Sequence, residues 1–99
     1  MKYKLLLKPE SVADISESYD WYENKISDLG NSFIMNIEAT LKKILKMPES
    51  FPLVYKNIRR GLTKKFPYGV YFLIEEDKVI VLAVIHLSRS PKTLIKIAN

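Results

Sequence analysis

The hydrophobic pattern is clearest between residues 66 and 91, where two long apolar runs are separated by the acidic pair Glu76-Asp77. Apolar runs of this length around a short polar pair predict two buried strands joined by a tight turn. Because side chains alternate along a strand, a two-residue turn also predicts the two faces of this hairpin. One face is expected to carry Tyr68, Val70, Phe72, Ile74, Val79, Val81, Ala83 and Ile85, and the other Gly69, Tyr71, Leu73, Ile80, Leu82, Val84 and His86.

Two amphipathic patterns precede the hairpin. The first starts at Pro9, which suits the first turn of a helix, and continues with apolar residues three and four positions apart. Its acidic residues Glu10, Asp14 and Glu17 are expected on the solvated side. The turn at residues 28–31 is short, which predicts two antiparallel helices. The apolar positions are Val12, Ile15, Tyr19, Tyr22 and Ile26 in the first helix, then Phe33, Ile34, Ile37, Leu41, Ile44 and Leu45 in the second.

Short extended segments predict the rest of the sheet. Residues 3–7 and 53–55 are strand candidates, and a strand over residues 58–65 leads into Phe66-Pro67. We therefore expect one α+β domain over residues 1–99, of order β-α-α-β-β-β. It is an antiparallel sheet with an N-terminal strand and the helical hairpin packed on one face. The other face then needs the tail, a second subunit or a partner protein to cover it.

Charge is distributed unevenly along this chain, whose net charge is +5. Between residues 10 and 38, seven acidic residues outnumber a single base; between residues 42 and 65, eight bases outnumber a single acid. This polarity predicts a basic surface for an anionic partner, either nucleic acid or an acidic protein. The alternative is that the charge serves solubility alone. The eight bases are Lys42, Lys43, Lys46, Lys56, Arg59, Arg60, Lys64 and Lys65.

Composition excludes several classes of protein. With no cysteine and one histidine, the chain is expected to hold neither a disulfide nor a metal, and it shows no cofactor motif. Its three glycines are scattered, so no loop is suited to cradle a phosphate. The longest apolar run, residues 79–85, is too short to cross a membrane, and no secretion signal is recognisable. We expect a cytoplasmic protein.

The end of the second hairpin strand carries the first candidate for chemistry. His86 is a candidate general acid or base in metal-free RNA cleavage, because histidine is the usual residue for proton transfer near neutral pH. Arg89, three residues later, could stabilise the charge on a phosphate. The structural alternatives are a strand-end histidine bonded to a loop carbonyl and an arginine that caps the same loop.

The strand expected over residues 58–65 carries four further candidates for binding a target or a phosphate. They are Arg59, Arg60, Lys64 and Lys65. Since side chains alternate along a strand, Arg60 and Lys64 are expected on one side and Arg59 and Lys65 on the other. Each pair can therefore serve only one surface.

Short fragments in a fixed order extend over nearly the whole chain. They are Asp20-Trp21-Tyr22-Glu23, Leu29-Gly30, Phe33, Pro48, Ile58-Arg59-Arg60, Phe66-Pro67-Tyr68, Tyr71 and Ala83-Val84, followed by His86, Arg89 and Pro91. At these spacings the chain resembles the RelE/ParE superfamily of bacterial type II toxins, and most of all its ParE, plasmid-stabilisation branch.

The resemblance implies a small cationic toxin that a cognate antitoxin wraps and holds inactive in a toxin–antitoxin oligomer. A ParE-like member would poison DNA gyrase by binding to it. The alternatives are a RelE-like endonuclease that cleaves mRNA on the ribosome and a non-toxic relic that still binds antitoxin. The tail, residues 92–99, lacks the aromatic residue or closing arginine of many members, which argues against ribonuclease activity.

Three residues are candidates for a partner-binding surface. Trp21 lies off the main apolar stripe of the first helix, where it could stack on a partner or line the rim of the core. Tyr71 and Leu82 lie on the hairpin face that the helices are not expected to cover.

Overall fold

The computed structural model describes residues 2–89 and residue 96. The tail, apart from Lys96, and Pro91 of the strand-end corner lie outside the described residues. The elements are β1 (Lys4–Leu7), α1 (Pro9–Lys25), α2 (Leu29–Lys46), the 3-10 turn η1 (Pro48–Ser50), β2 (Leu53–Tyr55), β3 (Ile58–Leu62), β4 (Tyr68–Glu75) and β5 (Lys78–His86).

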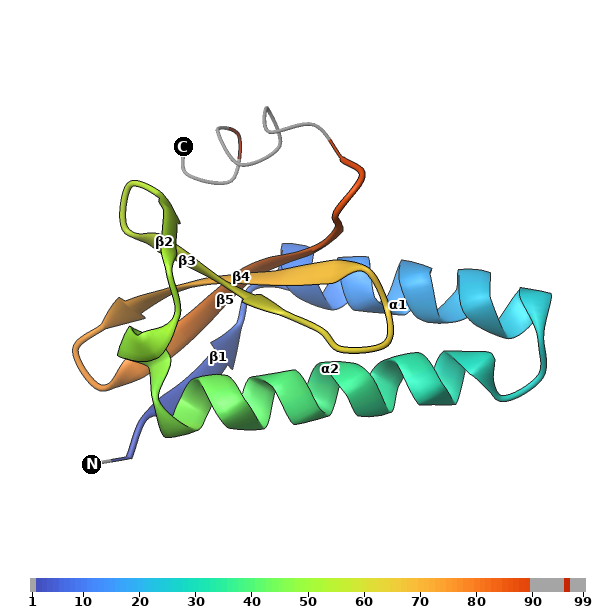
Figure 1. The fold of residues 1–99 in the computed structure, drawn as a ribbon, viewed down its shortest axis with the longest axis horizontal. Coiled ribbons are helices and arrows are strands. Elements are labelled where there is room, and N and C mark those ends of the chain that lie inside the picture. The colour runs from blue at the N-terminus through green and yellow to red at the C-terminus, as the bar shows by residue number, and fades with distance from the viewer. Residues whose placement is uncertain (1, 90–95, 97–99) are drawn as a thin grey trace.

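The five strands form one sheet in the order β1-β5-β4-β3-β2, and both helices lie on the same side of it (Figure 1). This confirms the expected α+β fold with a helical hairpin on one face. One pairing differs from the expected antiparallel sheet, because β1 runs parallel to β5, with Leu7 opposite Val81. The sheet is therefore mixed. A parallel pair needs a long connection, and here the whole of the intervening chain supplies it.

The bend between the helices is fixed by a carboxylate from α1. Glu23 accepts the backbone N–H groups of Asp28 and Gly30, each at 3.0 Å. These donors have no intrahelical partner because they lie at the start of α2. A side chain at Gly30 would lie 2.8 Å from the ring of Tyr19, so the glycine allows the two helices to approach. The helices consequently run side by side in opposite directions (Figure 1).

Helix α1 is rotated from the orientation that its apolar residues predict. Val12 and Ile26, expected in the stripe, are exposed, whereas Ser11 is buried and Asp14 is partly buried. The polar residues that turn inward have partners. The Ser11 hydroxyl donates to the carbonyl of Lys8 at 2.7 Å, and the carboxylate of Asp14 accepts a backbone N–H from β5. The expectation of a fully solvated Asp14 is wrong because this acceptor is needed by the sheet.

A β-bulge in β5 changes the predicted faces of the hairpin. Phe72 pairs with Val81, but the preceding residue of β4, Tyr71, pairs with Ala83, so Leu82 is an extra residue. An extra residue reverses the alternation of every side chain that follows it. Val84 therefore packs in the core under the helices, while Ala83 and Ile85 lie on the opposite face. Those three predicted positions, and that of His86, are wrong for this reason.

The core under the helices is built from both helices and the hairpin. Its buried residues are Phe33, Ile37, Ile44, Tyr68, Val70, Phe72, Val79, Val81 and Val84. A second apolar cluster lies on the other face of the sheet, with Ile58, Tyr71, Leu82, Ala83 and Ile85 as its buried members. Both faces of β4 and β5 are thus buried, as their continuous apolar sequences predict.

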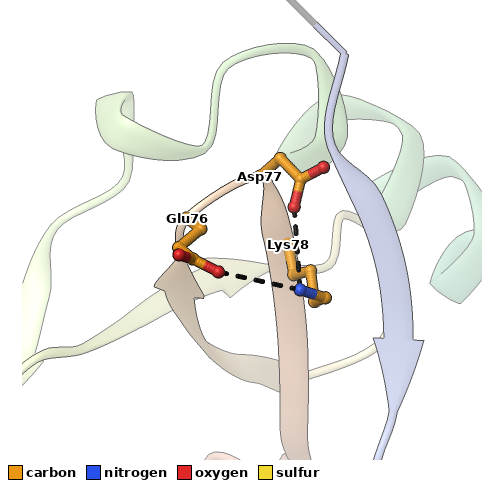
Figure 2. Close-up of polar contacts among 3 residues, drawn as sticks. All are labelled: Glu76, Asp77 and Lys78. Atoms are coloured by element: carbon orange, nitrogen blue, oxygen red, sulfur yellow. Dashed lines mark ion pairs between the residues drawn. The ribbon is translucent and has the colours of Figure 1, made fainter.

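The acidic pair forms the turn of the hairpin, as expected, because Glu75 and Lys78 are the last opposed residues. Glu76 takes a positive φ of 57°, a conformation that few residues other than glycine adopt. Lys78 Nζ lies 4.0 Å from Glu76 Oε1 and 3.8 Å from Asp77 Oδ1 (Figure 2). Such partly exposed ion pairs contribute little to stability, so they explain the composition of the turn and suggest no cation site.

Strand β3 ends three residues earlier than predicted. It stops at Leu62, and Lys64 and Lys65 follow in the loop that leads to β4. The backbone N–H of Lys65 donates to the side-chain carbonyl of Asn36 in α2 at 3.1 Å, which ties this loop to the helix. Strand alternation therefore does not apply to these two lysines.

We expect Glu23→Ala to lower the free energy of unfolding by about 1–2 kcal/mol, because two backbone donors lose their acceptor. For a chain of this size the melting temperature falls by roughly 4–8 °C for each kcal/mol. Thermal unfolding followed by circular dichroism measures the change. Asp20→Ala is the matched control, since it removes the same charge from an exposed position of α1. Equal melting temperatures for the two variants would contradict the role of Glu23.

Candidate target-binding cleft beside helix α1

A cleft of about 370 Å³ lies between α1 and the segment where β5 ends. Helix α1 contributes one wall, and β4, β5 and the residues after β5 contribute the other. Its volume falls in the range of sites that hold a small molecule or an anchoring side chain. The lining residues are Glu17, Ser18, Trp21, Tyr22, Tyr68, His86, Ser88 and Arg89.

The bulge places His86 in this cleft. Because the extra residue reverses the alternation, the side chain of His86 lies on the helix side of the sheet. There it pairs with Tyr68, and the two rings meet edge to face with centroids 5.2 Å apart. The imidazole Nδ1 accepts the backbone N–H of Ser88 at 3.1 Å, and the carbonyl of His86 accepts the N–H of Arg89 at 3.0 Å. The neutral ring therefore carries its proton on Nε2. These local bonds close the corner that brings Arg89 to the rim of the cleft.

The carboxylate of Asp14 completes the hydrogen bonding of β5 at this point. Strand β1 ends at Leu7, opposite Val81, and no other described strand pairs with this edge of β5 beyond it. Asp14 Oδ2 accepts the N–H of Val84 at 3.0 Å and closes this edge. Burial raises the pKa of Asp14 above its ordinary value, although the bond from Val84 and the charge of Arg89 partly oppose the shift.

Aromatic rings form the base of the cleft. The Tyr22 ring packs on those of Phe33, Phe66 and Tyr68, with centroids 5.4, 4.9 and 6.2 Å away. Burial, followed by the neighbouring Tyr68 hydroxyl, raises the pKa of Tyr22 to about 12. Its hydroxyl therefore stays protonated at neutral pH and cannot serve as a base. The cluster joins both helices to β4, which makes the base of the cleft part of the core.

Trp21 forms the exposed aromatic part of the same wall. Its side chain remains 57% exposed, with its ring edge to face against Tyr22 at 5.0 Å. The ammonium of Lys25 lies 4.9 Å from the ring centroid. An exposed indole beside a cleft offers a partner a large contact area at little cost in conformational entropy, which is why such rings are frequent in interfaces.

Of the cations predicted from the sequence, Arg89 shares the cleft with His86, whereas Arg59 and Arg60 do not line it. The guanidinium of Arg59 donates to the carbonyls of Glu49 and Phe51, at 3.1 and 2.6 Å, and thereby anchors η1 to the sheet. Arg60 lies on the opposite face from Arg59. Its aliphatic stem crosses Gly69, and its Nε is buried without a partner among the described residues.

The other predicted site residues lie at three places. Lys64 and Lys65 are exposed in the loop after β3. Tyr71 and Leu82 are only 6% and 9% exposed, within the second apolar cluster. Only Trp21, His86 and Arg89 of the sequence-predicted set meet in one cleft.

Sequence reasoning missed the residues that support this cleft. The sequence predicts a solvated Asp14, and it places Tyr68 only on one face of the hairpin. A signal is present in Ser11 and Ser18, which lie one turn before and one turn after Asp14 and Ile15 on the inward side of α1. Small polar residues on a helix face mark a place where a neighbouring strand comes close, but their pattern is weaker than that of large apolar residues.

Among the described residues, no group of three or more histidine, cysteine or acidic side chains is placed to hold a metal ion. Over the same part of the chain, neither helix has the length and apolar character to span a bilayer.

The fold is shared with solved toxin structures. The chromosomal ParDE TA system from P. aeruginosa contains a chain that superposes with a TM-score of 0.79 at 15% identity, covering 88% of this chain and 98% of that one. A copper-bound mutant toxin from Helicobacter pylori superposes with a TM-score of 0.52 at 22% identity, covering 89% and 97%. These likenesses show that the fold is shared.

The family follows from the sequence. Residues 5–91 match the family described as "ParE toxin of type II toxin-antitoxin system, parDE". The chain belongs to this family, which confirms the resemblance seen in its ordered fragments. No curated protein matches the sequence.

We expect Asp14→Asn to be at least as stable as the parent protein at neutral pH. The amide oxygen can still accept the Val84 N–H, and no charge is then buried. Because the pKa of Asp14 is raised in the folded state, this relative gain is absent below the ordinary pKa of about 3.9. It appears as the pH rises through the folded-state pKa and is constant above it.

Urea unfolding at about pH 3 and about pH 7 measures this difference. Asp14→Ala is the companion variant. It removes the acceptor, so it is expected to lose about 1–3 kcal/mol at both pH values. A gain for Asp14→Asn that is the same at low and neutral pH would refute the role of the buried charge.

Proposed function

We propose that this protein is the toxin of a cytoplasmic toxin–antitoxin pair, that it inhibits DNA gyrase by binding to it, and that a cognate antitoxin neutralises it. The membership in the ParE toxin family supports the class of target. The antitoxin partner is proposed by analogy with the ParDE TA system of P. aeruginosa, whose fold this chain shares.

The observation that carries the proposal is the separation of His86 from Arg60. His86 lies on the helix side of the sheet, whereas Arg60 lies on the opposite side, beside Gly69. RNA cleavage without a metal requires a base and cations around one phosphate, within hydrogen-bond reach. Arg59, on the helix side, is already bonded to two carbonyls. His86 therefore shares its cleft with Arg89 but with none of the four cations of residues 59–65, which supports a protein that acts by binding.

The cleft beside α1 is the surface that we assign to the target. It combines an exposed indole with a guanidinium, and residues of this kind dominate the binding energy of protein interfaces. The walls are held by the aromatic cluster and by Asp14, so binding requires little ordering of the free protein. Tyr71 and Leu82, which are buried on the opposite face, stay predicted contacts of the antitoxin.

We expect the purified protein to inhibit gyrase supercoiling of a relaxed plasmid, and Arg89→Ala to weaken the inhibition at least tenfold. A loss of about 1.4 kcal/mol of binding, within the range for an arginine anchor, is a factor of ten. Arg60→Ala is the matched control, since it removes the same charge from the opposite face and is expected to leave inhibition unchanged. Untouched supercoiling at a high excess of folded protein would refute the proposal.

A RelE-like endonuclease is the second candidate, and one observation favours it. Arg60 Nε is buried without a partner among the described residues, and an anion on that face would supply the missing acceptor. Since no histidine accompanies it on that face, we expect a reporter mRNA on translating ribosomes to stay intact with the purified protein. If the mRNA were cleaved, and if Arg60→Ala abolished this cleavage while Arg89→Ala preserved it, the endonuclease would replace gyrase inhibition as the proposed function.

A further inference from the structure

Six exposed lysines from three segments form a basic belt along α2. Lys2 precedes β1, three lysines lie in the last turns of α2, and two lie in the loop between β3 and β4. Neither the fold nor the cleft beside α1 requires these side chains. The belt consists of Lys2, Lys42, Lys43, Lys46, Lys64 and Lys65.

Two hollows on the flanks of α2 bring the segments of the belt together. A hollow of about 310 Å³ is lined by Lys43 from the helix and by Lys64 and Lys65 from the loop. One of about 450 Å³ is lined by Lys42 and Lys46 from the helix and by Lys2. Neither hollow is lined by an acidic residue. Lysine side chains therefore lie on both flanks of α2.

The belt is held in shape by bonds that leave its charges free. The Lys65 N–H bond to Asn36 ties the loop to α2, and the hydroxyl of Tyr3 donates to the carboxylate of Glu49 at 3.1 Å. The ion pairs found within the described residues involve Lys78, at the turn of the β4–β5 hairpin, and no lysine of the belt. No ion pair among these residues therefore occupies the ammonium groups of the belt.

Two ordinary explanations account for only part of the belt. Lysines in the last turn of a helix interact favourably with its dipole, which explains Lys43 and Lys46. It does not explain the bases that other segments bring beside them. Solubility could be served by bases spread over the surface, yet six of the sixteen lysine and arginine residues line two hollows that contain no acidic residue.

We propose that the basic belt binds the phosphates of duplex DNA without reading its sequence. Lysines of one sign, arranged along a helix and its two flanks, match a regular line of phosphates, and each neutralised phosphate releases bound counterions. The biological setting rests on the proposed function, because a protein that binds gyrase meets the DNA that gyrase holds. The belt would then add a contact with DNA to the contact with protein.

An acidic protein segment is the competing occupant, and the shape of the belt disfavours it. An amphipathic helix needs a continuous apolar groove. Here the apolar side chains Met35 and Leu45 line different hollows, and the lysine-bearing side of α2 lies between them. An amphipathic helix would therefore find no continuous apolar groove along the belt, whereas the lysines continue from one hollow to the other.

The test is the salt dependence of binding to a fluorescein-labelled duplex of about 20 base pairs, longer than α2. Fluorescence anisotropy is recorded between about 50 and 200 mM salt. If all six lysines contact phosphates, affinity falls about a thousandfold over this range, a slope near −5 on logarithmic axes. Lys64→Gln/Lys65→Gln is expected to make the slope shallower by about 2.

Lys4→Gln/Lys8→Gln is the matched control. It removes the same charge from exposed positions at β1 and is expected to keep the slope of the parent protein. Equal slopes for the two pairs would show that net charge alone attracts DNA and would overturn the belt. Tighter binding to an acidic peptide than to the duplex, with a slope near zero, would also overturn it.

The binding assay contains no gyrase, so the two proposals fail separately. Loss of DNA binding in Lys64→Gln/Lys65→Gln, combined with untouched supercoiling by the parent protein, would support the belt and refute gyrase inhibition. Gyrase inhibition by a parent protein that does not bind the duplex would have the opposite meaning.

Discussion

The extra residue in β5 is the constraint on which the candidate site depends. Without the bulge at Leu82, strand alternation would direct His86 to the face of the sheet that carries Arg60. With it, His86 lies against Tyr68 on the helix side, and the chain that follows turns toward α1. A change of one residue in register thus decides which charged groups can act together. It places the imidazole of His86 and the guanidinium of Arg60 on opposite faces of the sheet.

The end of β1 explains the rotation of α1. Beyond Leu7, no described strand lies beside this edge of β5, and an unpaired N–H in a partly buried place costs free energy. Asp14 satisfies this donor, but its carboxylate reaches Val84 only when that side of the helix faces the sheet. The serines that come inward with it are small enough for close packing. Tyr22, on the same side of α1, then contributes to the aromatic cluster under the cleft.

The elements of this fold are largely predictable from sequence, but the site is not. Period-two and period-three-to-four patterns depend on many residues, so the helical hairpin and the β4–β5 hairpin follow from them. The bulge depends on a single residue within an apolar run, where Leu82, Ala83 and Val84 offer no contrast of polarity. The inward turn of Asp14 depends on a backbone donor 70 residues away. The early end of β3, at Leu62, reflects the loop's bond to Asn36.

Two separate surfaces follow from these constraints, and they favour recognition over catalysis. Catalysis needs its acid, base and cations within hydrogen-bond reach of one atom, and the bulge, the sheet and the loop after β3 leave His86 with Arg89 in the cleft and keep the four cations of residues 59–65 away from it. Recognition gains from separation, because two modest contacts on one partner assembly act as if each were presented at high local concentration. An aromatic cleft beside α1 and a cationic belt along α2 lie on the same helical hairpin. Only a partner that offers both a protein surface and a line of phosphates would use the whole of it.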